Sequence, residues 1–332
     1  MEYRKVQMTG GSSFIVSLPK RWATNVGIKV GDELGIIEHE DGKLTISPRS
    51  HEITSEKKIN IDPSLPATLL ERLIVASYLA GYDLINIKSV SRITPEQRGI
   101  ISGIARKLIG PEIVEESNDS ILIQDILNSG DLSVKKAIKR MHMIVSSMQK
   151  DVIHALKVGD VYLARDVIQR DDDVDRLYLL IVRQLVTSVR HPVTADNLKI
   201  KTTDTLDLRI VAKSLERIGD HAEKIGSVIC EDSLKLPPHV VDPISNMNEF
   251  ALYLHREAMK ALFKEDFKLA NQIIEREKEI YKIKEEILEE LLYSDDACIM
   301  PMKIALITES LERIANYGTD IAEIAINQSI KE

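Results

Sequence analysis

The second half of this sequence contains an internal repeat. Residues 167–185 align without a gap with residues 273–291, at an offset of 106 positions. The tetrapeptide Leu-Glu-Arg-Ile also occurs twice, at residues 215–218 and 311–314. A repeat of this length indicates that one structural unit was duplicated, so the fold must accommodate two similar units in tandem.

The periodicity of the repeated part is helical. From about residue 132 onward, apolar residues recur every three or four positions, which is typical of amphipathic helices. The expected helices cover residues 133–158, 161–190 and 206–230 in the first copy and 244–263, 267–293 and 302–330 in the second. This pattern predicts two tandem three-helix bundles.

The first part of the chain has a different character. Residues 1–50 alternate between short β-rich runs and Gly or Pro turns, and residues 58–127 alternate between strand and helix patterns without a Gly-rich phosphate loop. We therefore predict a mainly α protein, in which a small β domain and a small α/β module precede the bundles. The expected domains are residues 1–50, 58–127, 131–234 and 240–332, with a polar linker at 51–58.

Composition limits the compartment and the type of core. Aromatic residues make up only 4% of the 332 residues, so the core must consist largely of Ile, Leu, Val and Ala. Cys230 and Cys298 lie far apart and have no CxxC partner, which argues against a disulfide framework and favours a reducing compartment. The first eight residues are polar, and no apolar run reaches the ~18–20 residues of a membrane span. We expect a cytoplasmic protein that reaches a membrane only through a partner.

The net charge of −8 is unevenly distributed. Residues 1–50 contain seven Lys/Arg and six Asp/Glu, whereas the remainder contains 37 against 46. Bulk charge therefore argues against nucleic-acid binding by the helical part. It permits such binding by the first fifty residues, especially after dimerisation.

Acidic residues four positions apart occur on two of the expected helices of the first copy. Asp171 and Asp175 form one pair, and Glu216 and Asp220 form the other. Residues at i and i+4 share a helix face, so four carboxylates converge if the two helices are neighbours. Such charges repel unless a cation lies between them, and oxygen ligands suit iron, manganese or magnesium. A solvated acidic face is the alternative, and the repeat favours the metal site.

The N-terminal segment resembles a known family of small β domains. Over residues 3–48 its motifs are similar to those of AbrB/SpoVT-type swapped-hairpin domains; they are Ser17-Leu18-Pro19-Lys20, Trp22-Ala23, Gly27-Ile28, Gly31-Asp32 and Leu44-Thr45-Ile46. The resemblance implies a homodimer that interleaves hairpins and binds DNA through basic side chains. The candidates for phosphate contact are Arg4, Lys5, Lys20 and Arg21. A module that dimerises without binding DNA is the alternative.

The helical half resembles the PhoU family of phosphate-uptake regulators. The resemblance rests on the duplicated three-helix bundle and on two acidic motifs, Asp-Asp-Asp-Val-Asp at 171–175 and Glu-Arg-Ile-Gly-Asp at 216–220. It implies a multinuclear iron or zinc cluster bound by Asp171, Asp175, Glu216 and Asp220. It also implies a phosphate transporter or a sensor kinase as a partner.

The second copy departs from this pattern. Tyr281 stands where the first copy has Asp175, and Asn316 stands where it has Asp220. Two carboxylates are therefore lost, and a weaker second site is expected; its residues are Glu277, Glu312, Asn316 and Asp320. In the first copy, His221 and Glu223 lie beside the motif, and both are more simply read as residues outside the ligand set.

These observations favour a regulator of phosphate homeostasis that is a homodimer or a higher oligomer and binds DNA. An adaptor that dimerises through its N-terminal domain and modulates a transporter or a sensor kinase, without binding DNA, is the second hypothesis. Enzymatic activity is not expected. The motif acids lack the Glu-x-x-His pairs of di-iron bundle enzymes, and no nucleophile constellation is present.

Overall fold

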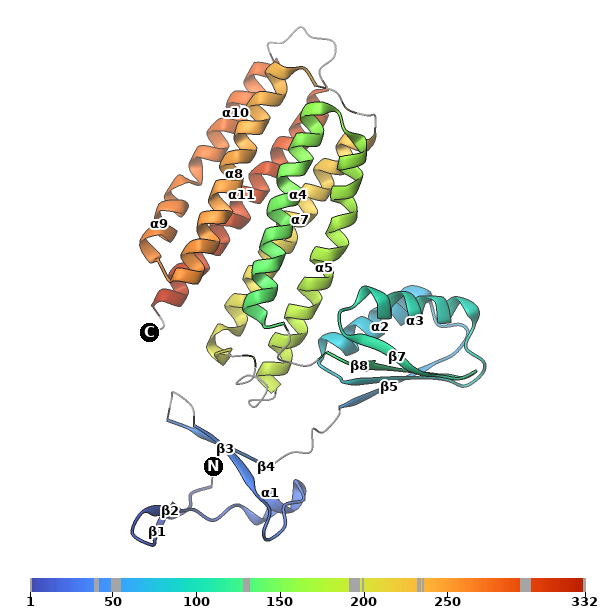
Figure 1. Ribbon diagram of the computed structural model, residues 1–332, viewed down its shortest axis with the longest axis vertical. Coiled ribbons are helices and arrows are strands. Elements are labelled where there is room, and N and C mark those ends of the chain that lie inside the picture. Colours follow the sequence, from blue (N-terminus) through green and yellow to red (C-terminus); the bar gives the residue numbers. More distant parts are fainter. Residues whose placement is uncertain are drawn as a thin grey trace. The chain divides into compact units, whose positions relative to one another are not determined.

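The computed structural model describes residues 2–38, 42–48, 55–127, 132–190, 198, 200–231, 234, 236–292 and 300–330. The chain forms two compact units, Met1–Thr54 and Ser55–Glu332 (Figure 1). The predicted class is confirmed, because the larger unit consists mainly of long helices and the smaller one of short strands. Cys298 lies outside the described residues, and Cys230 is a free thiol.

The first unit consists of two separate hairpins and a short helix. Strands β1 (Gln7–Thr9) and β2 (Ser13–Ile15) pair antiparallel, as do β3 (Leu34–Glu38) and β4 (Leu44–Pro48), and helix α1 (Lys20–Asn25) lies between the hairpins in the sequence. None of its described residues is buried. Two hairpins and a short helix of this size cannot enclose a core alone.

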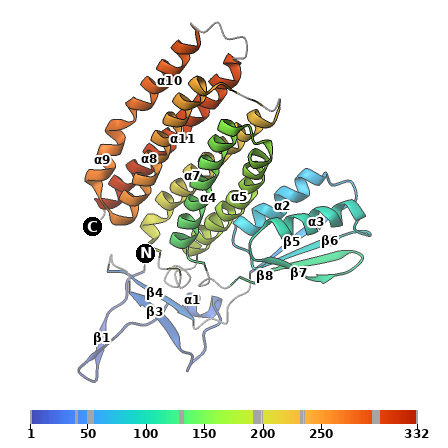
Figure 2. The same cartoon turned by 45° about the horizontal axis from the view of Figure 1, so that its top comes forward.

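The larger unit begins with the α/β module. Its elements are β5 (Glu56–Ile61), α2 (Ala67–Leu79), β6 (Leu84–Ser89), α3 (Pro95–Lys107), β7 (Pro111–Glu116) and β8 (Ser120–Asp125). The strand order is β5-β6-β8-β7, in which β5 and β6 are parallel and the other neighbours antiparallel. Both helices cover the same face of this sheet (Figure 2). Alternate strand residues such as Ile59, Ile87 and Ile121 are buried there with Leu70 and Ile74 of α2.

The first helical bundle follows the predicted pattern closely. It consists of α4 (Val134–Val158), α5 (Val161–Arg190) and α7 (Thr205–Glu231), with a 3-10 turn η1 (Thr202–Asp204) before α7. Helix α4 ends at Gly159, whose left-handed φ of 70° is typical of a glycine that caps a helix.

The second bundle differs from the prediction at two places. Its helices are α8 (Pro238–Lys264), α9 (Phe267–Arg276), α10 (Lys278–Leu292) and α11 (Pro301–Ser329). Helix α8 starts before the predicted residue 244, because Pro238 occupies the first helical position, where the missing N–H costs nothing. The helix predicted over 267–293 is interrupted at Glu277, which separates α9 from α10.

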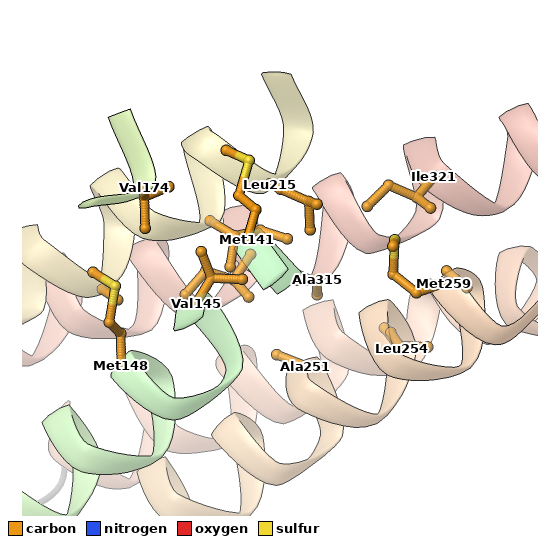
Figure 3. Packing of buried hydrophobic residues seen from close by; sticks show 14 of the residues in the cluster. Met141, Val145, Met148, Val174, Leu215, Ala251, Leu254, Met259, Ala315 and Ile321 are labelled. Atoms are coloured by element: carbon orange, nitrogen blue, oxygen red, sulfur yellow. The ribbon is translucent and has the colours of Figure 1, made fainter. Parts of the chain in front are cut away.

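The two bundles share one apolar core. Side chains of α4 and α7, among them Met141, Val145 and Leu215, belong to the same cluster as Leu254 of α8 and Ile321 of α11 (Figure 3). The repeated units therefore bury their apolar faces against each other, as tandem duplicated units commonly do.

A polar group lies between α4 and α8 inside this core. The ring nitrogens His142 Nε2 and His255 Nδ1 are 3.1 Å apart, and His255 Nε2 is 2.7 Å from Gln149 Oε1. Gln149 also donates from Nε2 to the Asn248 carbonyl at 3.4 Å. With the offset of 106, His142 corresponds to Asn248 and Gln149 to His255, so both copies contribute equivalent positions. We call these four residues the polar seam.

One arginine links the α/β module to the first bundle. Arg183 of α5 is buried, and its Nε lies 2.8 Å from Asp125 Oδ2 at the end of β8. Its Nη1 donates to the carbonyls of Tyr78 and Tyr82 at 2.7 and 2.9 Å, and the guanidinium stacks on the Tyr78 ring. Fully partnered in this way, the charge fixes the module on the end of α5.

Candidate metal centre

The four predicted ligands come from the two neighbouring helices α5 and α7. Asp171 and Asp175 lie one turn apart on α5, and Glu216 and Asp220 lie one turn apart on α7. Asp171, Asp175 and Asp220 each place one carboxylate oxygen within 4.8 Å of the others. Glu216 is the most buried of the four, with 8% of its surface exposed. The i, i+4 spacing on facing helices thus brings carboxylates together.

The acids perturb one another strongly. Burial, followed by repulsion from Asp175, Asp220, Glu223 and Glu216, raises the pKa of Asp171 to about 7. Burial, followed by repulsion from Glu216 and Asp220, raises the pKa of Asp175 to about 6. Desolvation and like charges both disfavour the ionised form, so a cation among these groups would relieve both effects.

Two oxygens of this cluster are buried and accept no hydrogen bond. They are Asp171 Oδ1 and Glu216 Oε2, although Glu216 Oε2 lies 3.9 Å from Arg217 Nε. Buried carboxylate oxygens are normally paired or bind metal, so these two atoms fit a site built for a cation. Gly219 leaves the space that this needs, because a Cβ there would lie 2.9 Å from Asp171 Oδ1.

Two cations that the spacing argument missed lie at the edge of the site. Lys213 binds Glu216 through Oε1, and Arg217 Nη1 lies 3.3 Å from Asp220 Oδ2. Both are on α7, three positions from the acid they contact, a spacing that the sequence displays. They compensate part of the negative charge and leave Asp171 and Asp175 without a basic partner in the described part of the chain.

The corresponding place in the second bundle is arranged differently. The Tyr281 hydroxyl lies 3.3 Å from Glu277 Oε1 and 3.3 Å from Asn316 Oδ1, and Lys284 Nζ binds Glu312 Oε2 at 2.6 Å. Burial and then Glu323 raise the pKa of Asp320. Among the described residues, these side chains do not form a group of three converging carboxylate, imidazole or thiolate ligands.

The two other candidates beside the motif have separate surroundings. His221 packs between α7 and α11, with its ring centroid 5.9 Å from that of Tyr317, and burial followed by Lys224 and Arg313 lowers its pKa to about 4. Glu223 faces the acidic cluster, since burial and then Asp220 raise its pKa.

The predicted DNA contacts lie on the surface of the first unit. Arg4, Lys5, Lys20 and Arg21 are exposed. Arg4 forms an ion pair with Glu2 and lies 3.4 Å from Ser17 Oγ.

No helix in the described part of the chain combines the length and the apolar composition that a membrane span requires.

Comparison with known proteins gives matches for both units. The family model "PhoU domain" matches residues 138–229 and again residues 244–325. The model "Antidote-toxin recognition MazE, bacterial antitoxin" matches residues 7–54.

Curated relatives match the helical part. The phosphate-specific transport system accessory protein PhoU homologue of Clostridium acetobutylicum is 25% identical over 194 residues, 56% of this chain and 86% of the relative. The homologue of Caulobacter vibrioides is 36% identical over 97 residues, 29% of this chain, and the match spans only 40% of that relative.

Solved structures share the fold of this part. The crystal structure of PhoU from Pseudomonas aeruginosa superposes with a TM-score of 0.53 at 23% identity, over 60% of this chain and 96% of that one. PhoU from Streptococcus pneumoniae gives a TM-score of 0.51 at 18% identity, over 60% and 94% of the two chains.

Proposed function

Because the chain belongs to the PhoU family, we propose that it is a dimeric, DNA-binding regulator of phosphate uptake whose first helical bundle holds a metal cluster. The curated relatives are named as accessory proteins of a phosphate-specific transport system, and one of the similar structures is named as a regulatory protein of a phosphate transport system. The family match over both repeats carries the regulatory part of the proposal. The match to a bacterial antitoxin domain at residues 7–54 supports the DNA-binding part.

The carboxylates of the first bundle are the proposed metal ligands. Asp171, Asp175, Glu216 and Asp220 would hold iron or zinc, and manganese or magnesium would also suit an all-oxygen ligand set. The buried oxygens of Asp171 and Glu216 that accept no hydrogen bond support this assignment. When bound, the ions would neutralise the cluster and fix α5 against α7, because each helix supplies ligands to the same site.

Only a weaker site is proposed in the second bundle. The Tyr281 hydroxyl and the Lys284 ammonium already satisfy oxygens of Glu277, Asn316 and Glu312, so a metal ion would have to displace both. If an ion binds there, Asp320 would be the remaining uncompensated ligand.

The surface of the first unit supports dimerisation. Large apolar side chains are exposed throughout it, among them Phe14 at 75%, Ile36 at 65% and Leu44 at 62%. In a single chain, none of the described residues of this unit is buried. A second copy that interleaves its hairpins with those of the first would cover these apolar side chains. The dimer would also double the basic side chains available to DNA.

An adaptor that does not bind DNA is the second candidate. It would dimerise in the same way and act on a sensor kinase or on a phosphate transporter, and the names of the accessory-protein relatives favour the transporter.

A binding experiment separates the two. Full-length protein and the variant Arg4→Gln/Lys5→Gln/Lys20→Gln/Arg21→Gln would be titrated with promoter DNA of phosphate-transport genes, and their mass would be measured by light scattering. The DNA-binding regulator requires binding that weakens with salt and is lost in a variant that remains dimeric. If the wild type does not bind DNA at low salt, the adaptor is the correct assignment.

A further inference from the structure

The negative charge of the helical part hides a strong asymmetry between its two copies. Residues 132–231 contain 17 Lys/Arg against 14 Asp/Glu, although they include the acidic cluster, whereas residues 232–332 contain 12 against 20. Helix α4 carries six of these 17 cations and only one acid, Asp151. The bulk charge of the helical part therefore does not exclude nucleic-acid binding by this helix.

The solvent-facing side of α4 is basic along its whole length. Lys135 is also exposed but lies about 100° around the helix from Lys136, and the exposed cations of this side are Lys136, Lys139, Arg140, Lys150 and Lys157. We call these five residues the α4 basic face. The acid on this side of the helix, Asp151, is half-buried at the edge toward α5, where it accepts hydrogen bonds from Arg170 at 2.8 Å and Ser147 at 3.1 Å.

Most of the α4 basic face is free of internal partners. Lys157 pairs with Asp242 at 3.3 Å, and Lys139 lies over the Phe263 ring. Among the described residues, Lys136, Arg140 and Lys150 form no ion pair. These three positive charges therefore remain available to an external anion.

The fold itself does not require these cations. Helix α8 is the counterpart of α4 in the second copy, and Asp242, Ser245 and Asn246 stand there at the positions of Lys136, Lys139 and Arg140. Both helices bury equivalent faces in the same core, so their solvent sides are free to differ. Lys150 differs, because the second copy has a cation, Arg256, at its position. The cations at positions 136, 139 and 140 are thus a property of one copy only, which points to a role outside folding.

The chemistry of the α4 basic face selects its partner. Protein interfaces and membrane-binding helices need a cluster of large apolar or aromatic side chains. On α4 the exposed large apolar side chains are only Met143, which is 72% exposed and lies among the cations, and Val158 at the end of the helix. A row of flexible lysines without an apolar centre suits a continuous polyanion. Helix α4 has 25 residues, a length of about 37 Å, close to one turn of duplex DNA.

We propose that the α4 basic face binds the phosphate backbone of duplex DNA. This contact would not depend on the DNA sequence and would add to the contacts made by the first unit. This inference rests on the proposed DNA-binding function and extends it to the helical part. Backbone contacts of this kind position a protein on the duplex, whereas base contacts elsewhere provide the sequence preference.

The test uses the full-length chain and four variants. Lys136→Gln/Arg140→Gln/Lys150→Gln removes the three cations of the α4 basic face that have neither an ion pair nor a ring contact among the described residues, and Lys268→Gln/Lys278→Gln/Lys282→Gln removes three exposed lysines of α9 and α10 as a matched control. The third variant carries the four glutamines in the first unit, and the fourth combines these with the α4 substitutions. Affinity for promoter and for random duplex DNA is measured against salt concentration.

Each phosphate contact contributes about 0.9 to the slope of log K against log salt, so the α4 variant should lose about 2.7 of that slope on both DNAs. The control should keep the wild-type slope. The first-unit variant should still bind random duplex DNA weakly, and the combined variant should not bind it.

Several results would overturn the proposal. An unchanged slope in the α4 variant, together with loss of binding in the first-unit variant, removes the α4 contact and leaves the proposed function intact. No DNA binding by the wild type removes both. Binding of the wild type to anionic phosphatidylglycerol vesicles but not to DNA, lost in the α4 variant, would assign the surface to lipid instead.

Discussion

The polar seam should make the stability of the two bundles depend on pH. Burial, with a smaller effect of Arg256, lowers the pKa of His142 to about 4, and burial, followed by the charges of His142 and Arg256, lowers the pKa of His255 well below its usual 6.5. Both rings are therefore neutral in the folded protein near neutral pH. The unfolded chain takes up protons at these two residues below about pH 6.5, so their contribution to the stability of the native state decreases as pH falls from there toward 4.

The size of the effect follows from the His142 shift. One pKa unit corresponds to about 1.4 kcal/mol, so at pH 5 protonation of this residue in the unfolded chain lowers the free energy of unfolding by about 2 kcal/mol relative to pH 8. His255 acts in the same direction.

The perturbation exchanges residues between the two copies. His142→Asn and His255→Gln introduce the side chains that stand at the equivalent positions, Asn248 and Gln149. Urea unfolding is followed by helical circular dichroism at pH 8 and at pH 5, and the free energy of unfolding is compared between the two pH values. This difference in the free energy of unfolding should be smaller by at least about 2 kcal/mol in the double variant than in the wild type. His154→Gln, on the exposed side of α4, is the matched control. An equal pH dependence in the wild type and the double variant would refute the reasoning.

Three further predictions concern packing, charge and the second bundle. Gly318→Ala should destabilise the protein by about 1–3 kcal/mol in urea unfolding, because the added Cβ would lie 2.9 Å from the backbone nitrogen of His255. Gly103→Ala is the control and should not destabilise the protein, because its Cβ would meet no atom within 4 Å. Arg183→Met should cost about 3–5 kcal/mol because the Asp125 carboxylate, 12% exposed, loses its cationic partner and keeps only the backbone N–H of Leu127. Adding Asp125→Asn should restore much of the loss; equal stability of the two variants would contradict this. Tyr281→Asp/Lys284→Tyr/Asn316→Asp gives these three positions of the second bundle the residues of the first. The metal content measured by elemental analysis should increase, and an unchanged content would show that other features disable this site.

The sequence predicted the parts of the fold that depend on local pattern. The apolar period places α4 and α5 within one residue of their observed ends, and Gly159 marks the end of α4 as expected. The i, i+4 spacing of Asp171 and Asp175 correctly anticipates that they share a face with Asp220 nearby. These features depend on neighbours in the sequence, which is why a single chain reveals them.

Features that depend on contacts between distant elements could not be predicted. Arg183 lies in a regular helical pattern, and only the folded chain shows that Asp125 and the carbonyl of Tyr78 surround it. The seam residue His142 likewise reads as an ordinary polar position until His255 is placed beside it. The net negative charge of the helical part concealed the basic side of α4. A net charge is summed over the whole segment, whereas a basic face depends on which side chains a single helix exposes to solvent.

The metal content of the purified protein tests the proposed regulator most directly. Full-length protein without an affinity tag would be analysed by elemental mass spectrometry beside Asp171→Asn/Glu216→Gln and beside Glu277→Gln/Glu312→Gln, which changes equivalent positions in the second bundle. We expect iron, zinc or manganese in the wild type, loss of that metal in the first variant and its retention in the second. Absence of metal from the wild type, or equal metal in all three proteins, would contradict the assignment of the first bundle as the metal centre.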